Sequence, residues 1–357
     1  KLGLQLPQHI VETLTELRER KLAKVPVGVL ATQRTPLLHA LESLTDLIPV
    51  QAVGAFASPD GSIANSTVPT AVYWQATGDP AALDYLRKAA GSAGDGGLPE
   101  WHLIDITEPA WVLYALKRAG VDSPAMRKQA DRLARLAAQA PHGLAAMTNN
   151  DFFDADNTAM VVTVLRMFGH AHEPLQQTLL AFEAEHYFRA FAFERNPAVT
   201  ANSHVLEALA PDREHFTRQI DKCTEFLLST RREEAWWIDK WHLSPYYATA
   251  HVVPGLSQVA PKALVGTWQW LLDTQHSDGS WGAGPGRPEE SALAVLALDS
   301  LAPHFGPIPD STRHRAHQFL AASLGTYDHA ELWVGKGLYL PRALVETTVL
   351  AAHVLTR

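Results

Sequence analysis

Residues 151–169 read DFFDADNTAMVVTVLRMFG, a cluster of acidic and amide side chains that runs directly into an apolar segment. The apolar residues recur at intervals of three and four, which is the pattern of a buried helix face. The same spacing recurs in PAWVLYALKRAGV (109–121), SALAVLALDSLA (291–302) and RALVETTVLAAHVL (342–355). Strict alternation of apolar and polar residues, which indicates a half-buried strand, is almost absent. The sequence therefore predicts an all-α fold of many short helices.

Two segments begin with the same tripeptide and indicate an internal repeat. The sequence DGS at 60–62 and again at 278–280 is followed each time by a polar loop and then by a helical pattern. Such repeats are typical of duplicated helical hairpins, which bury their apolar faces only against one another. The chain is long enough for more than one domain, and the glycine-rich segment 94–99 is a plausible boundary. We therefore expect one helical unit over residues 1–97 and a larger barrel of paired helices over residues 98–357.

Composition argues against several classes of function. The formal net charge of −8, without a run of lysine or arginine, argues against a nucleic-acid partner. No apolar run reaches the length of a membrane span, and no signal peptide is visible. The single cysteine, Cys223, excludes a disulfide scaffold and fits a reducing compartment, so we expect a cytoplasmic protein. Because the chain begins at Lys1, without methionine and close to a helical pattern, we expect that upstream sequence is missing.

The acidic cluster allows three interpretations. Asp154 precedes an apolar run, as the N-cap of a helix does. Asp154 and Asp156 are also candidate metal ligands, although two carboxylates without nearby histidine or cysteine form a weak metal pattern. Thirdly, carboxylates crowded into an apolar cavity do not all ionise, so one of them keeps its proton and can act as a strong general acid. Protonation of an alkene needs such an acid, in a dry pocket that tolerates a carbocation.

Several motifs together carry a resemblance to a known family. Segment 154–159 is similar to an Asp-x-Asp-Asp-Thr-Ala motif, with Asn157 in place of the third carboxylate, and segment 275–281 matches a Gln-Trp repeat. The motifs RKLAKVP, TPLLHALESL, NSHVLEAL, WWIDKWHLSPYYATAH and LWVGKGLYLPR also occur, all in the family's order. The chain resembles the bacterial class II diterpene cyclases of the (ent-)copalyl diphosphate synthase type over nearly its whole length.

The resemblance implies both an architecture and a reaction. It implies a partial γ domain over residues 1–97 and a β domain over residues 98–357, both of them α-barrels. It also implies an isomerase-type enzyme that protonates the terminal alkene of geranylgeranyl diphosphate, closes two rings and then loses a proton, with the diphosphate retained. Ent-copalyl diphosphate is the best single product, and a class I diterpene synthase would consume it. Two alternatives stay open: a drimenyl, halimadienyl or other labdane-type cyclase, and a non-catalytic prenyl-binding α-barrel module.

The family motif assigns roles to several acidic and neighbouring residues. Asp156 matches the general acid, and Asp154 would hydrogen-bond and orient it. Asn157 removes a negative charge that would favour the protonated form of Asp156, so we expect slower turnover than with aspartate at this position. His39 matches a histidine that, in plant-type enzymes, positions with an asparagine the water that takes the final proton. The partner position in this chain is Glu100, which leaves the product open, and a buried structural histidine is the alternative for His39.

Two lysines and two aromatic residues complete the expected site. Lys21 and Lys240 match lysines that bind the substrate diphosphate, which carries roughly two to three negative charges and needs cations at one end of an apolar pocket. Trp241 and Tyr246 are the first choices for pocket walls, because aromatic faces stabilise positive charge. Solvated surface lysines and ordinary core aromatics are the corresponding structural alternatives.

The resemblance also implies Mg²⁺ as a cofactor of the diphosphate. In the family an acidic motif upstream of the segment around Lys21 binds this metal. The acidic residues before Lys21 in this chain are Glu12, Glu16 and Glu19. Their spacing is that of a solvated helix face, and they form no acidic cluster. We therefore expect the metal ligands to lie upstream of residue 1 or to be absent.

Overall fold

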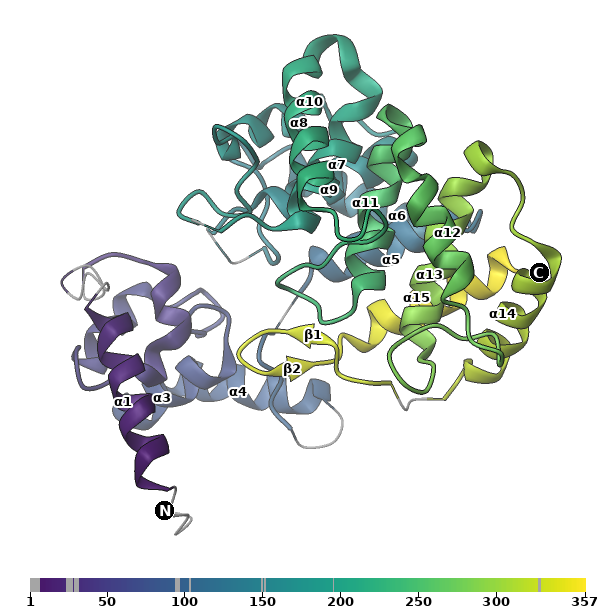
Figure 1. Cartoon of the computed structure of the whole chain (residues 1–357). Helices are drawn as coiled ribbons and strands as arrows, with labels where there is room; N and C mark the ends of the chain where they lie inside the picture. Colours follow the sequence, from purple (N-terminus) through teal and green to yellow (C-terminus); the bar gives the residue numbers. More distant parts are fainter. Residues whose placement is uncertain are drawn as a thin grey trace. The chain divides into compact units, whose positions relative to one another are not determined.

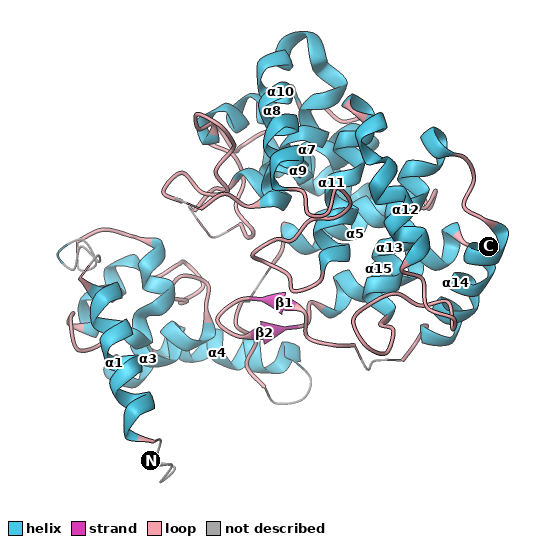
Figure 2. Ribbon diagram, in the orientation of Figure 1, coloured by secondary structure: helices cyan, strands magenta, loops and turns pink. Residues whose placement is uncertain are grey.

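Helices make up both units into which the chain divides, Lys1–His102 and Leu103–Arg357, as Figures 1 and 2 show. The computed structural model describes residues 7–23, 28, 32–93, 97–102, 104–148, 150, 152–194, 196–326 and 329–357. The predicted all-α fold is confirmed by this architecture. The assignment of residues 1–97 and 98–357 to γ and β domains stays a prediction.

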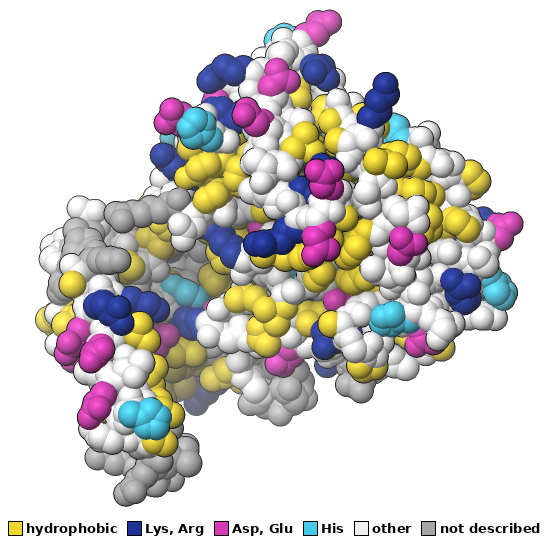
Figure 3. All heavy atoms as spheres, in the orientation of Figure 1, with side chains coloured by type: hydrophobic (Ala, Val, Ile, Leu, Met, Phe, Trp, Pro, Cys, Tyr) yellow, Lys and Arg dark blue, Asp and Glu magenta, His cyan; other side chains and the backbone are white. Residues whose placement is uncertain are grey.

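The first unit is a group of helices around a core of its own. Its elements are α1 (Gln8–Leu22), η1 (Pro36–Ser43), η2 (Val50–Phe56), α3 (Thr67–Thr77) and α4 (Pro80–Ala93). Helix α3 packs against α4, η1 and η2. The buried core consists of Leu38, Leu41, Leu44, Ile48, Val53, Ile63, Ala64, Tyr73 and Ala82. No residue of α1 is buried, and Figure 3 shows apolar and charged side chains on different sides of this helix.

The second unit is a barrel of paired helices. In the part that the structure describes, six helices contact one another in a closed ring, α5–α7–α9–α11–α13–α15 and back to α5. In that order their bounds are Thr107–Arg118, Ala155–Met167, Val199–Leu209, Pro245–Val259, Pro288–Phe305 and Arg342–Leu355. Every residue of α9 is buried, as expected for a helix that is enclosed on all sides. Even so, no helix in the described ranges is long and apolar enough to cross a membrane.

The remaining helices of this unit lie against the ring. Helix α6 contacts α5 and α7, α8 contacts α7, α10 contacts α9, α12 contacts α13, and α14 contacts α13 and α15. Their bounds are Pro124–Ala137, Glu173–Thr178, Arg213–Thr230, Val265–Asp273 and Asp310–Ser323, and the short elements η3, η4 and η5 cover Leu179–Phe182, Ala210–Asp212 and Pro261–Leu264. Strands β1 (Trp333–Val334) and β2 (Leu338–Tyr339) form an antiparallel pair. This alternation of ring and flanking helices is what the predicted helical hairpins produce.

The repeated DGS tripeptide forms the same turn in both units. In each copy the aspartate accepts from the serine N–H at 3.0 Å, and from the serine hydroxyl at 2.7 Å in the first copy and 2.6 Å in the second. The central residues Gly61 and Gly279 have φ angles of +86° and +91°. An added Cβ would lie 2.4 Å from the carbonyl oxygen of Ala81 or 2.3 Å from that of Arg315. Both turns therefore need glycine.

Candidate active site

Asp154 caps the helix that carries the acidic cluster. Helix α7 begins at Ala155, and Asp154 before it has extended backbone angles, φ −137° and ψ 154°. Its Oδ1 accepts the backbone N–H of Asn157 at 2.6 Å, and its two carboxylate oxygens accept from the Asn157 side-chain amide at 3.0 and 2.9 Å. The capping interpretation therefore holds for Asp154. We expected this carboxylate to bond the side chain of Asp156, and the structure shows it engaged by Asn157.

The environment of Asp154 favours its neutral form. Asp154 is 3% exposed, and this burial raises its pKa to about 8, because a buried carboxylate loses its hydration. The N–H groups of Asn157 stabilise the anion and limit the rise, whereas the nearby charge of Asp156 adds to it. The side-chain oxygen of Asn157 accepts from the Thr107 hydroxyl at 2.5 Å, which orients the amide nitrogen toward Asp154. Residue 157 is thus an uncharged partner of Asp154.

Asp156 contacts a histidine from the next helix of the ring. Its Oδ1 lies 2.6 Å from Nδ1 of His204, which comes from α9. The side chain of Asp156 is 19% exposed and that of His204 is 1% exposed. Burial lowers the pKa of His204, but the charge of Asp156 and its hydrogen bond outweigh burial, so the net direction is upward. The structure thus pairs a carboxyl group in the first turn of α7 with an imidazole of α9.

A second histidine follows the first. Nε2 of His204 lies 2.8 Å from Nδ1 of His251, on helix α11. Trp111 of α5 packs edge-on against His204, with ring centroids 5.5 Å apart. Asp156 is therefore connected through His204 to His251, and both imidazoles are buried.

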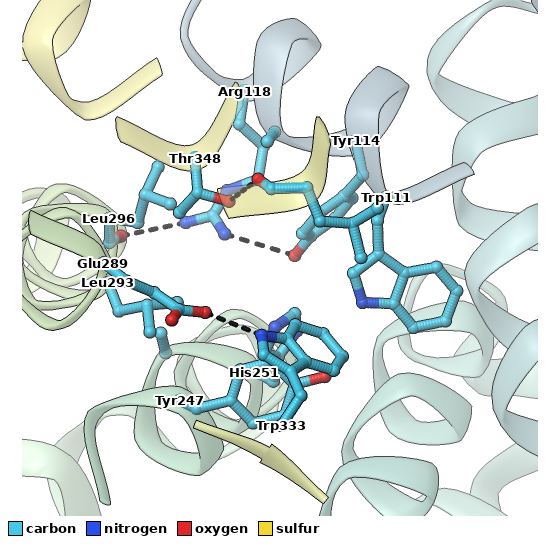
Figure 4. A pocket seen from close by; sticks show the side chains of 13 residues that line it. Trp111, Tyr114, Arg118, Tyr247, His251, Glu289, Leu293, Leu296, Trp333 and Thr348 are labelled. Atoms are coloured by element: carbon cyan, nitrogen blue, oxygen red, sulfur yellow. Dashed lines mark hydrogen bonds between the residues drawn. The ribbon is translucent and has the colours of Figure 1, made fainter. Parts of the chain in front are cut away.

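A small cavity lies beside His251 (Figure 4). Its volume is about 30 Å³, which suits about one water molecule and is far below the roughly 300–1,000 Å³ of usual ligand pockets. Its wall includes Glu289, whose Oε1 accepts from Nε1 of Trp333 at 2.9 Å and from Nε2 of His242 at 3.3 Å. On the opposite wall Arg118 donates to the carbonyl oxygen of Leu296 at 2.9 Å. The cavity by itself is too small for an isoprenoid chain.

Two neighbouring tyrosines of α11 have different surroundings, and the expectation that Tyr246 lines the substrate pocket stays a prediction. Tyr247 lines the cavity, and its ring centroid lies 4.5 Å from that of His251. Tyr246 instead stacks on Trp270 of α12, with centroids 4.7 Å apart. Consecutive helix residues point about 100° apart, so only one of two neighbouring tyrosines can face the centre. Every residue from Tyr246 to Ser257 is buried. A helix buried on all sides has no exposed polar face from which to predict which tyrosine points to the centre of the ring.

Lys240 and Trp241 lie near the start of α7. Lys240 forms an ion pair with Glu194, and its Nζ lies 4.9 Å from the ring centroid of Trp241. Glu194 also accepts the N–H of Ala190 at 3.0 Å, and the carbonyl oxygen of Ala190 accepts the N–H of Ala155 at 2.8 Å. Lys240 is thus connected to the acidic helix through Glu194. Its Nζ also donates to the carbonyl oxygen of Asn196 at 2.8 Å, so an anionic ligand would compete with Glu194 for its charge.

Comparison with known proteins identifies the family. Residues 190–296 match the family model described as the squalene-hopene cyclase C-terminal domain. A copalyl diphosphate synthase from Streptomyces anulatus is 36% identical over 277 residues, which are 72% of this chain and 48% of that protein. The solved structure of ent-copalyl diphosphate synthase from Streptomyces platensis is 30% identical, with a TM-score of 0.81, and the match covers 96% of this chain and 67% of that one. The chain belongs to the bacterial class II diterpene cyclases.

This diterpene cyclase chain spans only part of the length of its relatives. A type B diterpene cyclase from Mycobacterium tuberculosis is 29% identical over 367 residues, 99% of this chain and 72% of that protein. The chain thus spans about half of one named relative and somewhat over two thirds of another. The activity of the whole diterpene cyclase is therefore a matter for proposal.

The first unit of the diterpene cyclase brings together the pair expected to hold water. Nε2 of His39 lies 3.2 Å from Oε1 of Glu100, and the imidazole stacks on the Trp101 ring with centroids 4.2 Å apart. The two side chains are 22% and 15% exposed, but Nδ1 of His39 is itself buried. Within the described residues, Nδ1 of His39 has no hydrogen-bond partner. An imidazole held by a carboxylate on one nitrogen is suited to bind a water molecule through the other.

The same unit of the diterpene cyclase contains the expected diphosphate contact Lys21, which is exposed in the last turn of α1. Glu12, Glu16 and Glu19 are exposed on the same helix. Across the described ranges of the chain, no group of three or more His, Cys, Asp or Glu side chains could hold a metal ion. The glutamates of α1 do not fit the Mg²⁺ site that the family resemblance implies.

Sequence reasoning missed His204 and His251 as site residues of the diterpene cyclase. Both lie in motifs that carry the family resemblance, NSHVLEAL and YYATAH. Their available signal was a histidine within an apolar helix, and such a histidine is commonly a satisfied core residue. Glu194 and Glu289 were also missed, because no local pattern marks their partners.

Proposed function

We propose that this chain carries the general acid of a class II cyclisation and that the protein converts geranylgeranyl diphosphate into a bicyclic, copalyl-type diphosphate. Asp156 is the general acid in this proposal. Its main support is the 2.6 Å contact between Asp156 and the buried His204 in the first turn of a barrel helix. The relatives named copalyl diphosphate synthase support the reaction class. On the same basis, ent-copalyl diphosphate is the best single product.

Protonation of an alkene is demanding because its immediate product is a carbocation. The O–H bond of Asp156 breaks, its electron pair stays on the carboxylate, and a C–H bond forms at the alkene carbon. His204 stabilises the new carboxylate through the hydrogen bond already present at 2.6 Å. This interaction strengthens as charge develops, and it therefore lowers the barrier rather than only binding the substrate.

The state of Asp154 suits this role of Asp156. Burial raises the pKa of Asp154 to about 8, so Asp154 is mostly protonated at pH 7. Asp154 therefore brings little negative charge to the site at this pH. Asn157 holds Asp154 in place through its amide group. Asp154 and Asn157 are therefore proposed to position the acid segment.

Lys240 and Lys21 are the proposed contacts of the diphosphate. A lysine–phosphate hydrogen bond is charge-assisted and about twice as strong as a neutral one. For Lys240 this bond would replace the ion pair with Glu194. Trp241, whose ring lies beside Lys240, is the proposed aromatic wall, since its face stabilises a passing cation. Mg²⁺ is proposed as a further counter-ion of the diphosphate, and no described residue is assigned to it.

The final proton is proposed to go to a water molecule held by His39 and Glu100. A carboxylate at this place makes the bound water more basic than an amide does. The position of proton loss decides which alkene forms. The 3.2 Å contact of His39 with Glu100 therefore favours, as a second candidate, a cyclase with a drimenyl, halimadienyl or other labdane-type product.

A cytoplasmic location and transfer of the product to a class I diterpene synthase complete the proposal. Cys223, the one cysteine of the sequence, is buried with a free thiol, which fits a reducing compartment. The retained diphosphate is the leaving group that an ionising synthase would need.

The proposal is tested by incubating the chain with geranylgeranyl diphosphate and Mg²⁺, removing the diphosphate with a phosphatase, and identifying the alcohol by mass spectrometry against chiral standards. We expect the alcohol of ent-copalyl diphosphate from the wild type and roughly 10³-fold less from Asp156→Asn. Asp84→Asn, at an exposed aspartate that is paired with Lys88, is the matched control. Binding of the substrate without any cyclic alcohol, also by Asn157→Asp, would support the prenyl-binding module instead.

A further inference from the structure

His251 extends the acid pair into a chain of three residues. Its Nδ1 lies 2.8 Å from Nε2 of His204, whose Nδ1 lies 2.6 Å from Asp156. The three side chains come from α11, α9 and α7, which are successive helices of the ring. His204 is 1% exposed and His251 is 7% exposed. Both ring nitrogens of His204 are therefore hydrogen-bonded within the core.

The groups around His204 favour a positive charge on its ring. Asp156 contacts it directly, and the carboxyl groups of Glu207 and Asp239 also act on it. Burial lowers the pKa of His204, but the ionised forms of these groups raise it more, so this balance describes the state in which Asp156 has released its proton. A charged imidazole donates from both nitrogens, so it donates from Nδ1 to Asp156 and from Nε2 to its other neighbour.

The groups around His251 favour a neutral ring. The titratable groups that face it are His204 of α9, Arg118 and Tyr114 of α5, Tyr247 of its own helix, Glu289 of α13 and His242. Burial and then the positive charges of His204, Arg118 and His242 lower the pKa of His251 well below its usual range. The Tyr247 ring, 4.5 Å away between centroids, shields it from solvent. His251 is thus suited to accept at Nδ1.

We propose that His251 is a positioning residue: as the neutral acceptor of the second N–H of His204, it allows His204 to remain a buried imidazolium beside Asp156. The catalytic meaning of this arrangement rests on the proposed function. When Asp156 gives its proton to the alkene, the new carboxylate forms against a positive charge rather than a neutral ring. Such a charge-assisted hydrogen bond is about twice as strong as a neutral one. His251 therefore strengthens the acid without touching the substrate.

Removal of this acceptor is expected to change the charge of His204. In His251→Leu the Nε2–H of a buried cation has no partner, which favours the neutral form of His204. The loss of a buried partner lowers the pKa of His204 by about 1–2 pH units. Asp156 then faces a neutral ring, and we expect cyclisation at least about 10-fold slower. A residue that only fills space would leave the titration of His204 unchanged.

The experiment compares the 357-residue wild-type chain with His251→Leu and His251→Asn. Asparagine places its Oδ1 where the histidine has Nδ1 and thus restores the acceptor. NMR titration of chains labelled with ¹⁵N-histidine, assigned with His204→Gln, measures the pKa of His204, with the 81% exposed His186 as internal reference. Turnover of geranylgeranyl diphosphate is measured on the same samples. We expect the leucine variant to show both changes, and the asparagine variant to stay within about 3-fold of wild-type turnover.

Each outcome decides the inference separately from the proposed function. An equal pKa of His204 in wild type and His251→Leu overturns the inference, whatever the activity. A lower pKa of His204 in His251→Leu than in wild type supports the role of His251. If the wild type also makes no cyclic product, the proposed function is refuted while this role stands. If circular dichroism shows that His251→Leu does not fold, the ¹⁵N NMR spectrum of the wild type gives the tautomer of His251 instead. A proton on Nε2 and none on Nδ1 supports the inference, and a proton on Nδ1 overturns it.

Discussion

Replacement of Asp154 with asparagine is expected to stabilise the protein progressively as the pH rises. Burial raises the pKa of Asp154 from 3.8 to about 8. Between these two values the unfolded chain has lost this proton and the folded chain keeps it. The free energy of unfolding therefore falls as the pH rises from about 4 to about 8, and it levels off above that. Asparagine at 154 removes this dependence.

The magnitude follows from the size of the pKa difference. The difference is about 4 pH units, and each unit is worth about 1.4 kcal/mol, so ionisation of Asp154 costs about 5 kcal/mol of stability by pH 8. Asparagine caps helices about as well as aspartate, and its oxygen can accept the same N–H of Asn157. Between pH 5 and pH 8, we expect the stability difference to move by about 4 kcal/mol in favour of the variant.

Urea denaturation followed by circular dichroism, at several pH values from about 5 to about 8.5, measures this difference. Asp278→Asn is the control whose difference from wild type should stay constant over this range. Hydrogen bonds from Ser280 lower the pKa of Asp278 from 3.8, so its stabilising effect is fully present above about pH 5 and is lost only at more acidic pH, as the pH falls through its folded pKa. If the difference between Asp154→Asn and wild type stays constant over this range, Asp154 ionises equally in both states. Such a result would show that burial does not raise the pKa of Asp154.

Three further outcomes are expected. Asn157→Asp should raise turnover by roughly 10-fold at neutral pH, because a nearby negative charge favours a protonated acid and a shift of about one pKa unit is about tenfold in population. Steady-state kinetics showing equal or lower turnover would contradict this. Lys240→Gln should raise the KM for the diphosphate substrate by about 10–100-fold, and an unchanged KM would exclude Lys240 as a contact. Gly279→Ala should cost at least about 2 kcal/mol, because its Cβ would lie 2.3 Å from the Arg315 carbonyl oxygen; an unaltered melting temperature would show that the turn tolerates a side chain.

Features that depend on neighbours in the chain were predictable from the sequence. Helical spacing reports contacts three and four residues apart, and it predicted the ring helices α5, α7, α13 and α15. The DGS turn closes within three residues, and its repeat was visible before the structure. Asp154 bonds the N–H of a residue three positions later, so its role as a cap was one of the predicted alternatives. The acid motif itself was recognised for the same reason, since its members lie within six positions.

The partners of the acid were decided by the tertiary structure alone. His204 lies 48 residues after Asp156, and His251 a further 47 after His204. Lys240 meets Glu194 across 46 residues. Contacts at such separations arise because six helices close into a ring, and no local pattern encodes which side chain of a fully buried helix points to the centre. The sequence by itself therefore determined helices, turns and the acidic motif, whereas ring closure decided which histidines lie next to Asp156 and which tyrosine lies beside them.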